Sequence, residues 1–274
     1  MYQLPDDNTL FQSLSGILKP AYELVGIAER KQLTETSTYP VERVVGRMAD
    51  GTEREFFCKY LAGGGPNAFG HRGGVEYESL VYRKILSGIP LSMIHYYGES
   101  RMANNDMVVV LEFLGHYLRF VKSGDPDGLV KAAGWIGSFH RLMEGQSPDF
   151  IRRYDKSYYQ SWMDHFRKVN ACLWESHPAL DKLLTLFSRH LWMLSDTSHT
   201  IIHGEYYPRN VLMKKGVIYP VDWESAAIVK ADDQLLRVAR SSWFDPRPLD
   251  LSRLDPSALR SRKDRIWEAV TAAF

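Results

Sequence analysis

The first part of the chain changes from a helical to an alternating pattern of hydrophobic positions. Four apolar residues at helical spacing predict a helical segment within residues 1 to about 26, which Pro20 interrupts: Leu10, Leu14, Leu18 and Tyr22. Short β-prone runs separated by turns then predict antiparallel strands at residues 26–33, 41–48 and 55–61, with two more within 91–114. The Asp50-Gly51 pair is a strong hairpin signal. A small antiparallel sheet is therefore expected.

Helical periodicity dominates the rest of the chain. One helix is predicted at residues 75–86, between the third and fourth strands. Beyond Gly115 the apolar spacing predicts helices at 129–143, 158–175, 178–194 and near 261–272. The fold class that follows is α+β, with a sheet-rich part at 1–114 and a mainly helical part at 115–274.

A polar cluster interrupts this pattern between Ile201 and Glu224. Val211 and Leu212, a Lys-Lys-Gly turn, and a β-prone run at 217–221 predict two short strands joined by a tight turn. Such a hairpin would hold three polar residues at one rim: Glu205, Asn210 and Asp222. A carboxylate that accepts a hydroxyl proton, together with an amide oxygen and a second carboxylate that bind Mg²⁺, is the equipment of phosphoryl transfer.

Two motifs in this stretch resemble a known family. The run from His203 to Leu212, HGEYYPRNVL, resembles the H-G-D-x-x-P-x-N-V-L signature of the aminoglycoside phosphotransferase and choline kinase group. The run VDWE at Val221 to Glu224 resembles that group's I-D-W-E. The resemblance implies a bilobal protein-kinase-like fold, with a nucleotide-binding lobe at 1–114 and a helical lobe at 115–274. It also implies ATP or GTP and Mg²⁺ as cofactors, and a small hydroxylated molecule as the phosphate acceptor.

The resemblance assigns roles to individual residues. Glu205 would orient the acceptor hydroxyl and receive its proton, and Asn210 and Asp222 would bind Mg²⁺. Lys59, isolated among apolar residues of the third strand, would reach the nucleotide phosphates. Its ion-pair partner would be Glu78 on the next helix. Glu76 is the competing partner, but two residues that differ by two positions point about 200° apart on a helix. His203 would brace the loop.

Further positions follow from the register of the same resemblance. Glu112 and Leu114 would lie at the hinge whose backbone binds the nucleotide base. The phosphate-covering turn would fall at residues 34–39, which contain Ser37 but no glycine. The glycine-dense stretch at 62–74 fits neither phosphate-loop motif and is interpreted as a surface connection. Acceptor contacts are expected from residues beside the two motifs: Tyr206, Tyr207, Arg209, Trp223 and Glu224.

Glu205 departs from the family pattern, which usually has Asp at this position. The extra methylene group moves the carboxylate by roughly 1 Å, and a displacement of that size can cost about a hundredfold in rate. Together with the glycine-free turn, this leaves a second hypothesis open: a pseudokinase that binds a nucleotide or small molecule without turnover. A protein kinase is disfavoured because the chain lacks the H-R-D, D-F-G and A-P-E motifs.

Composition excludes several other classes of protein. The 274 residues are 45% hydrophobic and 24% charged, which is ordinary for a globular protein. A formal net charge of +1 argues against a nucleic-acid partner. The two cysteines have no zinc-site spacing. No signal-peptide pattern and no apolar run of about 18 residues occurs, so a cytoplasmic protein without a membrane partner is predicted.

Overall fold

The computed structural model describes residues 4–19, 21–33, 39–61, 70, 73–102, 106–115, 117–119, 126–171, 177, 179–190 and 199–230. Two compact units form, one from residues 1–132 and 205–225, the other from 133–204 and 226–274. The predicted lobe boundary after residue 114 stays a prediction. Ser37, most of the glycine-dense connection and the predicted helix at 261–272 lie outside the described residues.

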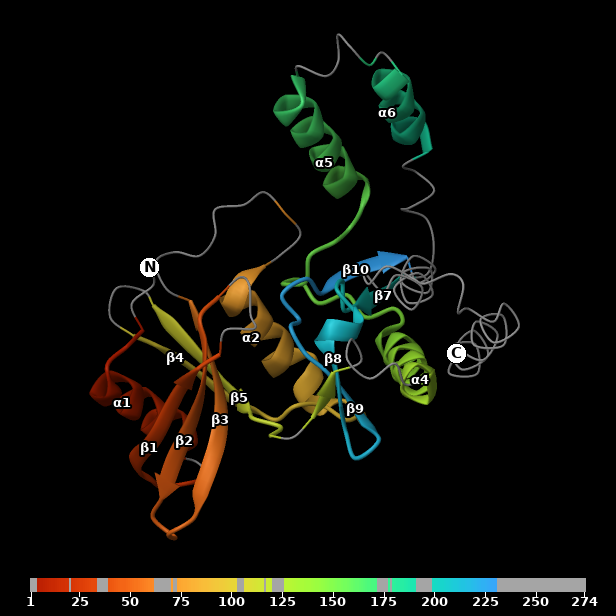
Figure 1. Cartoon of the computed structure of the whole chain (residues 1–274). Coiled ribbons are helices and arrows are strands. Elements are labelled where there is room, and N and C mark those ends of the chain that lie inside the picture. Colours follow the sequence, from red (N-terminus) through yellow and green to blue (C-terminus); the bar gives the residue numbers. More distant parts are fainter. Residues whose placement is uncertain are drawn as a thin grey trace, which may run out of the picture. The chain divides into compact units, whose positions relative to one another are not determined.

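A five-stranded antiparallel sheet forms the centre of the first unit (Figure 1). Its strands lie in the order β1-β2-β3-β5-β4: β1 (Leu24–Gln32), β2 (Val41–Met48), β3 (Glu53–Leu61), β4 (Tyr96–Arg101) and β5 (Met107–Glu112). The predicted hairpin turn joins β2 to β3, where the Asp50 carboxylate accepts hydrogen bonds from the backbone and hydroxyl of Thr52. The antiparallel sheet expected from the sequence is therefore confirmed.

Helix α1 (Asp7–Leu18) covers one face of this sheet. The Asp6 side chain caps it by accepting a hydrogen bond of 2.8 Å from the Thr9 backbone N–H. The helix buries one apolar stripe against alternate residues of β3 and β5: Leu10, Leu14 and Leu18 against Phe56, Cys58, Tyr60, Val108 and Val110. Successive side chains on a strand point to opposite faces, so the intervening residues of β3 face away from α1.

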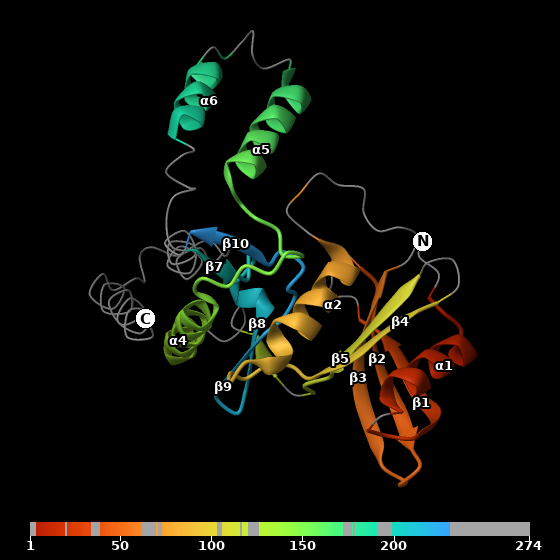
Figure 2. The same ribbon diagram turned by 180° about the vertical axis from the view of Figure 1, so that it is seen from behind.

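Helix α2 (Gly74–Lys84) packs against β3, β4 and β5 on the other face, as the two opposite views show (Figures 1 and 2). A short 3₁₀ helix, η1 (Leu86–Gly88), follows it. The buried side of α2 includes Glu78 and Tyr82. Lys59, one residue beyond Cys58 on β3, consequently points toward α2.

The segment 205–225 also belongs to the first unit. It contains η5 (Pro208–Asn210), β8 (Val211–Lys214) and β9 (Val217–Pro220), and β8 also pairs with β6 (Leu118–Arg119). Lys215 and Gly216 have φ values of 50° and 78°, as the two-residue turn of a tight hairpin requires. Asn210 thus lies immediately before the hairpin and Asp222 shortly after it. The Val221 N–H donates a hydrogen bond of 2.9 Å to the Asn210 carbonyl, which ties the two ends together.

The second unit contains the C-terminal part of α4 (Pro126–Met143), together with α5 (Lys156–Val169) and α6 (Ala179–His190). Its two-stranded antiparallel sheet pairs β7 (His199–Ile202) with β10 (Ala227–Lys230). Tyr159 of α5 contacts Phe187 of α6 edge to face, with ring centroids 6.3 Å apart. None of the helices in the described residues has both the length and the apolar content needed to cross a bilayer.

Candidate active site

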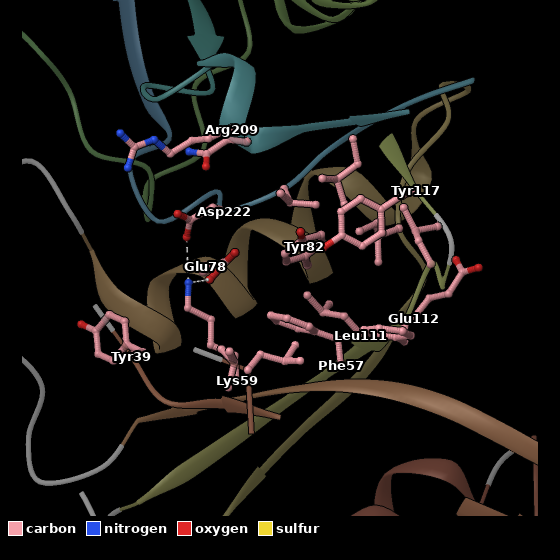
Figure 3. A pocket seen from close by; sticks show the side chains of 18 of the residues that line it. Tyr39, Phe57, Lys59, Glu78, Tyr82, Leu111, Glu112, Tyr117, Arg209 and Asp222 are labelled. Carbon is pink, nitrogen blue, oxygen red and sulfur yellow. Dashed lines mark hydrogen bonds and ion pairs between the residues drawn. The ribbon is translucent and has the colours of Figure 1, made fainter. Parts of the chain in front are cut away.

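A cavity of about 480 Å³ lies within the first unit, and all the residues that line it belong to that unit (Figure 3). One end is polar, where Lys59, Glu78 and Asp222 meet. The other end is mainly apolar and aromatic: Phe57, Tyr82, Leu111 and Tyr117. The cavity therefore offers a charged end and an apolar end to a single elongated ligand.

Lys59 lies at the centre of the polar end. Its Nζ atom is 2.6 Å from Glu78 Oε2 and 2.8 Å from Asp222 Oδ1. Burial by itself lowers the pKa of the Lys59 ammonium, but the charges of Glu78 and Asp222 outweigh burial and raise that pKa above its usual value. Lys59 therefore stays a cation at any physiological pH.

Glu78 is positioned through both of its carboxylate oxygens. Oε2 accepts from Lys59, and Oε1 accepts a hydrogen bond of 3.0 Å from the Trp223 backbone N–H. Burial raises the pKa of the Glu78 carboxyl, while the Lys59 ammonium opposes that change. Glu76, the competing partner for Lys59, forms an exposed ion pair with Arg101 instead. Helix packing thus directs one of the two glutamates into the cavity and the other to the surface.

The hairpin supplies two residues whose side-chain oxygens could bind a metal ion, Asn210 and Asp222. The Asn210 side-chain amide donates a hydrogen bond of 3.0 Å to the Glu205 carbonyl, so its amide oxygen remains as a ligand atom. Asp222 adopts a left-handed backbone conformation with φ of 69°. A non-glycine residue held in this region costs about 1 to 3 kcal/mol and is typical of positions under functional constraint. Both residues line the cavity.

Three carboxylates of this segment converge. One oxygen atom from each of Glu205, Asp222 and Glu224 lies within 4.8 Å of the others. Glu205 is 4% exposed and Glu224 is fully buried. Carboxylate and amide oxygens are the donors that hard divalent cations such as Mg²⁺ prefer, so the residues present fit the metal that the sequence predicted.

The apolar end includes residues that the sequence analysis did not single out. Phe57 lies on the same face of β3 as Lys59 and pairs across the sheet with Leu111 of β5. Tyr82 lies one turn after Glu78 on α2. Phe57 lies two residues before Lys59 on a strand, and Tyr82 lies four residues after Glu78 on a helix, so both spacings could have placed them on the cavity face. No such signal in the sequence pointed to Tyr117. Glu112 and Leu114, the predicted hinge residues, both line the cavity.

The residues predicted to contact the acceptor differ in their positions. Arg209 lines the cavity, and Tyr207 is 37% exposed. Tyr206 is buried, and its hydroxyl donates a hydrogen bond of 2.7 Å to the Ala132 carbonyl. Trp223 is completely buried and donates from its indole N–H to the Pro220 carbonyl. Of the residues predicted beside the two motifs, Arg209 lines the cavity, whereas Glu205, Tyr206, Tyr207, Trp223 and Glu224 do not. Their roles toward an acceptor stay predictions.

Two other predicted positions remain. His203 is fully buried in the second unit, and its bracing role stays a prediction. Ser37 lies outside the described part of the chain.

The chain has the fold of the aminoglycoside phosphotransferases and choline kinases, which confirms the resemblance read from its motifs at the level of the fold. Three solved structures illustrate the likeness. Amicoumacin kinase hAmiN, in complex with AMP-PNP, Ca²⁺ and Ami, superposes with a TM-score of 0.62 at 13% identity, covering 94% of this chain and 77% of that one. Aminoglycoside 2′-phosphotransferase-IIIa with GDP gives 0.57 at 11% identity, covering 98% and 100%. Choline kinase LicA from Streptococcus pneumoniae gives 0.55 at 11% identity, covering 95% and 89%.

Sequence comparison adds nothing to this likeness, since no family model and no curated protein matches the chain.

Proposed function

We propose that this protein is a nucleotide- and Mg²⁺-dependent phosphotransferase that acts on a hydroxyl group of a small molecule. The observation that carries the proposal is the contact of Lys59 with the buried Glu78 and with the partly buried Asp222 at the polar end of the cavity. Similar solved structures support it, because they hold AMP-PNP with Ca²⁺ in one case and GDP in another.

The proposed roles follow the two ends of the cavity. Lys59, held in place by Glu78, binds the phosphates. The base occupies the apolar end, where the backbone from Glu112 to Leu114 recognises its edge. Asn210 and Asp222 would hold Mg²⁺, which would supply the charge that neutralises the phosphates. A single nucleotide thereby satisfies the charged and apolar halves of the cavity at once.

The acceptor hydroxyl is proposed to bind near Glu205. Its carboxylate orients the hydroxyl and receives the proton during transfer. Phosphoryl transfer through a loose transition state depends mainly on positioning and on charge neutralisation, so it does not need a strong base. Arg209 and Tyr207 follow Glu205 closely in the chain and are exposed, which leaves their side chains accessible to an acceptor.

The proposal is tested first by nucleotide binding. The wild-type protein should show a thermal shift with AMP-PNP that requires Mg²⁺, and the variant Asp222→Asn should lose the Mg²⁺-dependent part. The matched control is Asp164→Asn, which changes an exposed residue on α5 and should behave as wild type. Absence of any shift in the wild-type protein would contradict the proposal.

Turnover is tested by measuring ADP release with ATP, Mg²⁺ and a library of hydroxylated small molecules. Stimulated release, with a phosphorylated product detected by mass spectrometry, is the expected outcome. Nucleotide binding without transfer to any compound of a broad library would instead favour a pseudokinase.

A further inference from the structure

Glu205 lies closer to the metal-binding residues than its predicted role requires. The sequence resemblance assigns Mg²⁺ to Asn210 and Asp222 and leaves Glu205 to the acceptor. In the structure, however, a Glu205 carboxylate oxygen lies within 4.8 Å of ligand atoms on both Asp222 and Glu224. Oxygen atoms that surround one divalent cation at about 2.0 to 2.6 Å are separated by distances in this range.

The length of the side chain explains why Glu205 reaches this cluster. Glutamate is longer than aspartate by one carbon–carbon bond, about 1.5 Å. An Asp on the same backbone would hold its carboxylate nearer to the loop. The residue that departs from the family pattern is thus one of the three carboxylates that converge.

The burial and chemistry of the cluster fit a cation. Glu205 is 4% exposed and Glu224 is fully buried, and each places one carboxylate oxygen within 4.8 Å of the other and of an Asp222 oxygen. Carboxylate oxygens are the ligands that hard divalent cations prefer.

We infer that Glu205 is itself a ligand of the divalent cation, in a set formed with Asp222, Glu224 and Asn210. One Glu205 oxygen binds the cation, and the other remains for the acceptor hydroxyl. Mg²⁺ usually binds through one or two carboxylates and relies on substrate phosphates for the rest. A set with three carboxylates has enough charge to hold the cation before any nucleotide arrives. This inference rests on the proposed function for the existence of the metal site.

Mn²⁺ titration followed by electron paramagnetic resonance, without nucleotide, tests the inference. Wild-type protein should bind Mn²⁺, and Glu205→Gln should bind it at least about tenfold more weakly. Mutation of a residue that only orients a metal ligand already costs about 10- to 100-fold in metal affinity, so loss of a ligand should cost at least as much. Glu205→Asp should also weaken Mn²⁺ binding, because its shorter side chain holds the carboxylate farther from Asp222 and Glu224. The control Glu76→Gln alters an exposed glutamate of α2 and should bind Mn²⁺ as wild type.

Thermal melting with and without Mn²⁺ supplies a second measurement. Glu205→Gln removes a charged metal ligand, so its Mn²⁺-induced rise in Tm should be smaller than that of the wild type. A folded Glu205→Gln protein that binds Mn²⁺ with wild-type affinity, and shows the same Mn²⁺-induced rise in Tm, would overturn the inference.

Repeating the titration with AMP-PNP separates the two proposals. Suppose that the wild-type protein and Glu205→Gln both bind Mn²⁺ only when AMP-PNP is present, and with equal affinity. That result would overturn the role of Glu205 as a metal ligand but would leave the proposed function standing. Wild-type protein that binds no Mn²⁺ under either condition would overturn the proposed function as well.

Discussion

Lys59 and Asp222 are 163 positions apart in the chain, yet Lys59 Nζ lies 2.8 Å from Asp222 Oδ1. Glu78 completes the group from a third element, so a strand, a helix and the end of a hairpin each contribute one charged side chain (Figure 3). Ion pairs this well buried constrain the residues around them, because an unpaired charge in the same place is costly.

The first prediction concerns the stability that this group provides. Lys59→Met should destabilise the protein by about 3 to 5 kcal/mol, because it leaves the Glu78 carboxylate buried without its partner. Urea unfolding without nucleotide measures the loss. The double variant Lys59→Met/Glu78→Gln should recover part of it. A single variant as stable as the wild type would show that the pair is not desolvated.

The second prediction separates two glutamates of the same helix. Glu78→Gln should weaken AMP-PNP binding about tenfold, equal to about 1.4 kcal/mol, because Lys59 loses the charge that holds it in the cavity. Glu76→Gln changes only an exposed ion pair with Arg101 and should leave that affinity unchanged. Isothermal titration calorimetry with Mg²⁺ present compares the two variants. Equal effects would argue against the assignment of Glu78.

The third prediction uses two glycines in different surroundings. A Cβ atom on Gly46 of β2 would lie only 2.6 Å from the Leu24 Cδ1 atom, so Gly46→Ala should destabilise the protein by about 1 to 3 kcal/mol. A Cβ atom on Gly16 of α1 would meet nothing within 4 Å, so Gly16→Ala should stabilise the protein by about 0.5 to 1 kcal/mol. Thermal melting measures both effects. The same sign for the two substitutions would contradict the packing described for β2.

The fourth prediction concerns the Cys58 thiol. Cys58 is completely buried under α1, and burial raises the pKa of its thiol to about 12. In a Cys172→Ser background, Ellman's reagent near pH 8 should therefore react with the native protein far more slowly than with the protein in urea. The thiolate fraction alone falls on the order of a thousandfold relative to a free cysteine of pKa about 8.5. Rapid reaction of the native protein would show that β3 opens readily.

The fifth prediction is a dependence of stability on pH. Burial lowers the pKa of His140, on α4, to about 3, whereas an unfolded histidine has a pKa near 6.5. Above about pH 6.5 both states are neutral, and the full stability is present. As the pH falls from about 6.5 toward about 3, only the unfolded state gains the proton, so stability declines by up to about 1.4 kcal/mol per pH unit.

Urea unfolding at about pH 7 and about pH 5 measures this decline. The variant His140→Gln cannot bind the proton and should show a shallower dependence on pH. Identical slopes for the variant and the wild type would mean that His140 titrates alike in both states.

Local patterns predicted much of the secondary structure. The β-prone run at 41–48 coincides with β2, and the Asp50-Gly51 and Lys215-Gly216 pairs lie in the turns that their chemistry predicts. Helix α5 ends at Val169, well before the predicted end at residue 175, because Asn170 leaves helical geometry. Such features depend on residues within a few positions of one another, and for that reason they are readable from one sequence.

The motifs also identified side chains that the structure brings together, including Lys59, Glu78, Asn210 and Asp222. The two-residue period of a strand predicts which other residues of β3 lie on the same face as Lys59. It does not predict which helix or loop packs against that face. The resemblance already favoured Glu78 over Glu76 as the partner of Lys59, and the structure agrees. Tertiary packing alone decided that Tyr206 and Trp223 are buried.

By itself, then, the sequence determined the local elements and the chemistry of the motif residues. The tertiary structure decided which of those residues share one cavity, and it placed the Glu205 carboxylate beside Asp222 and Glu224. The physical reason is the separation along the chain of the residues that interact. Periodicity and turn preferences arise from neighbouring residues, whereas a meeting of side chains more than a hundred positions apart is set by how whole strands and helices pack.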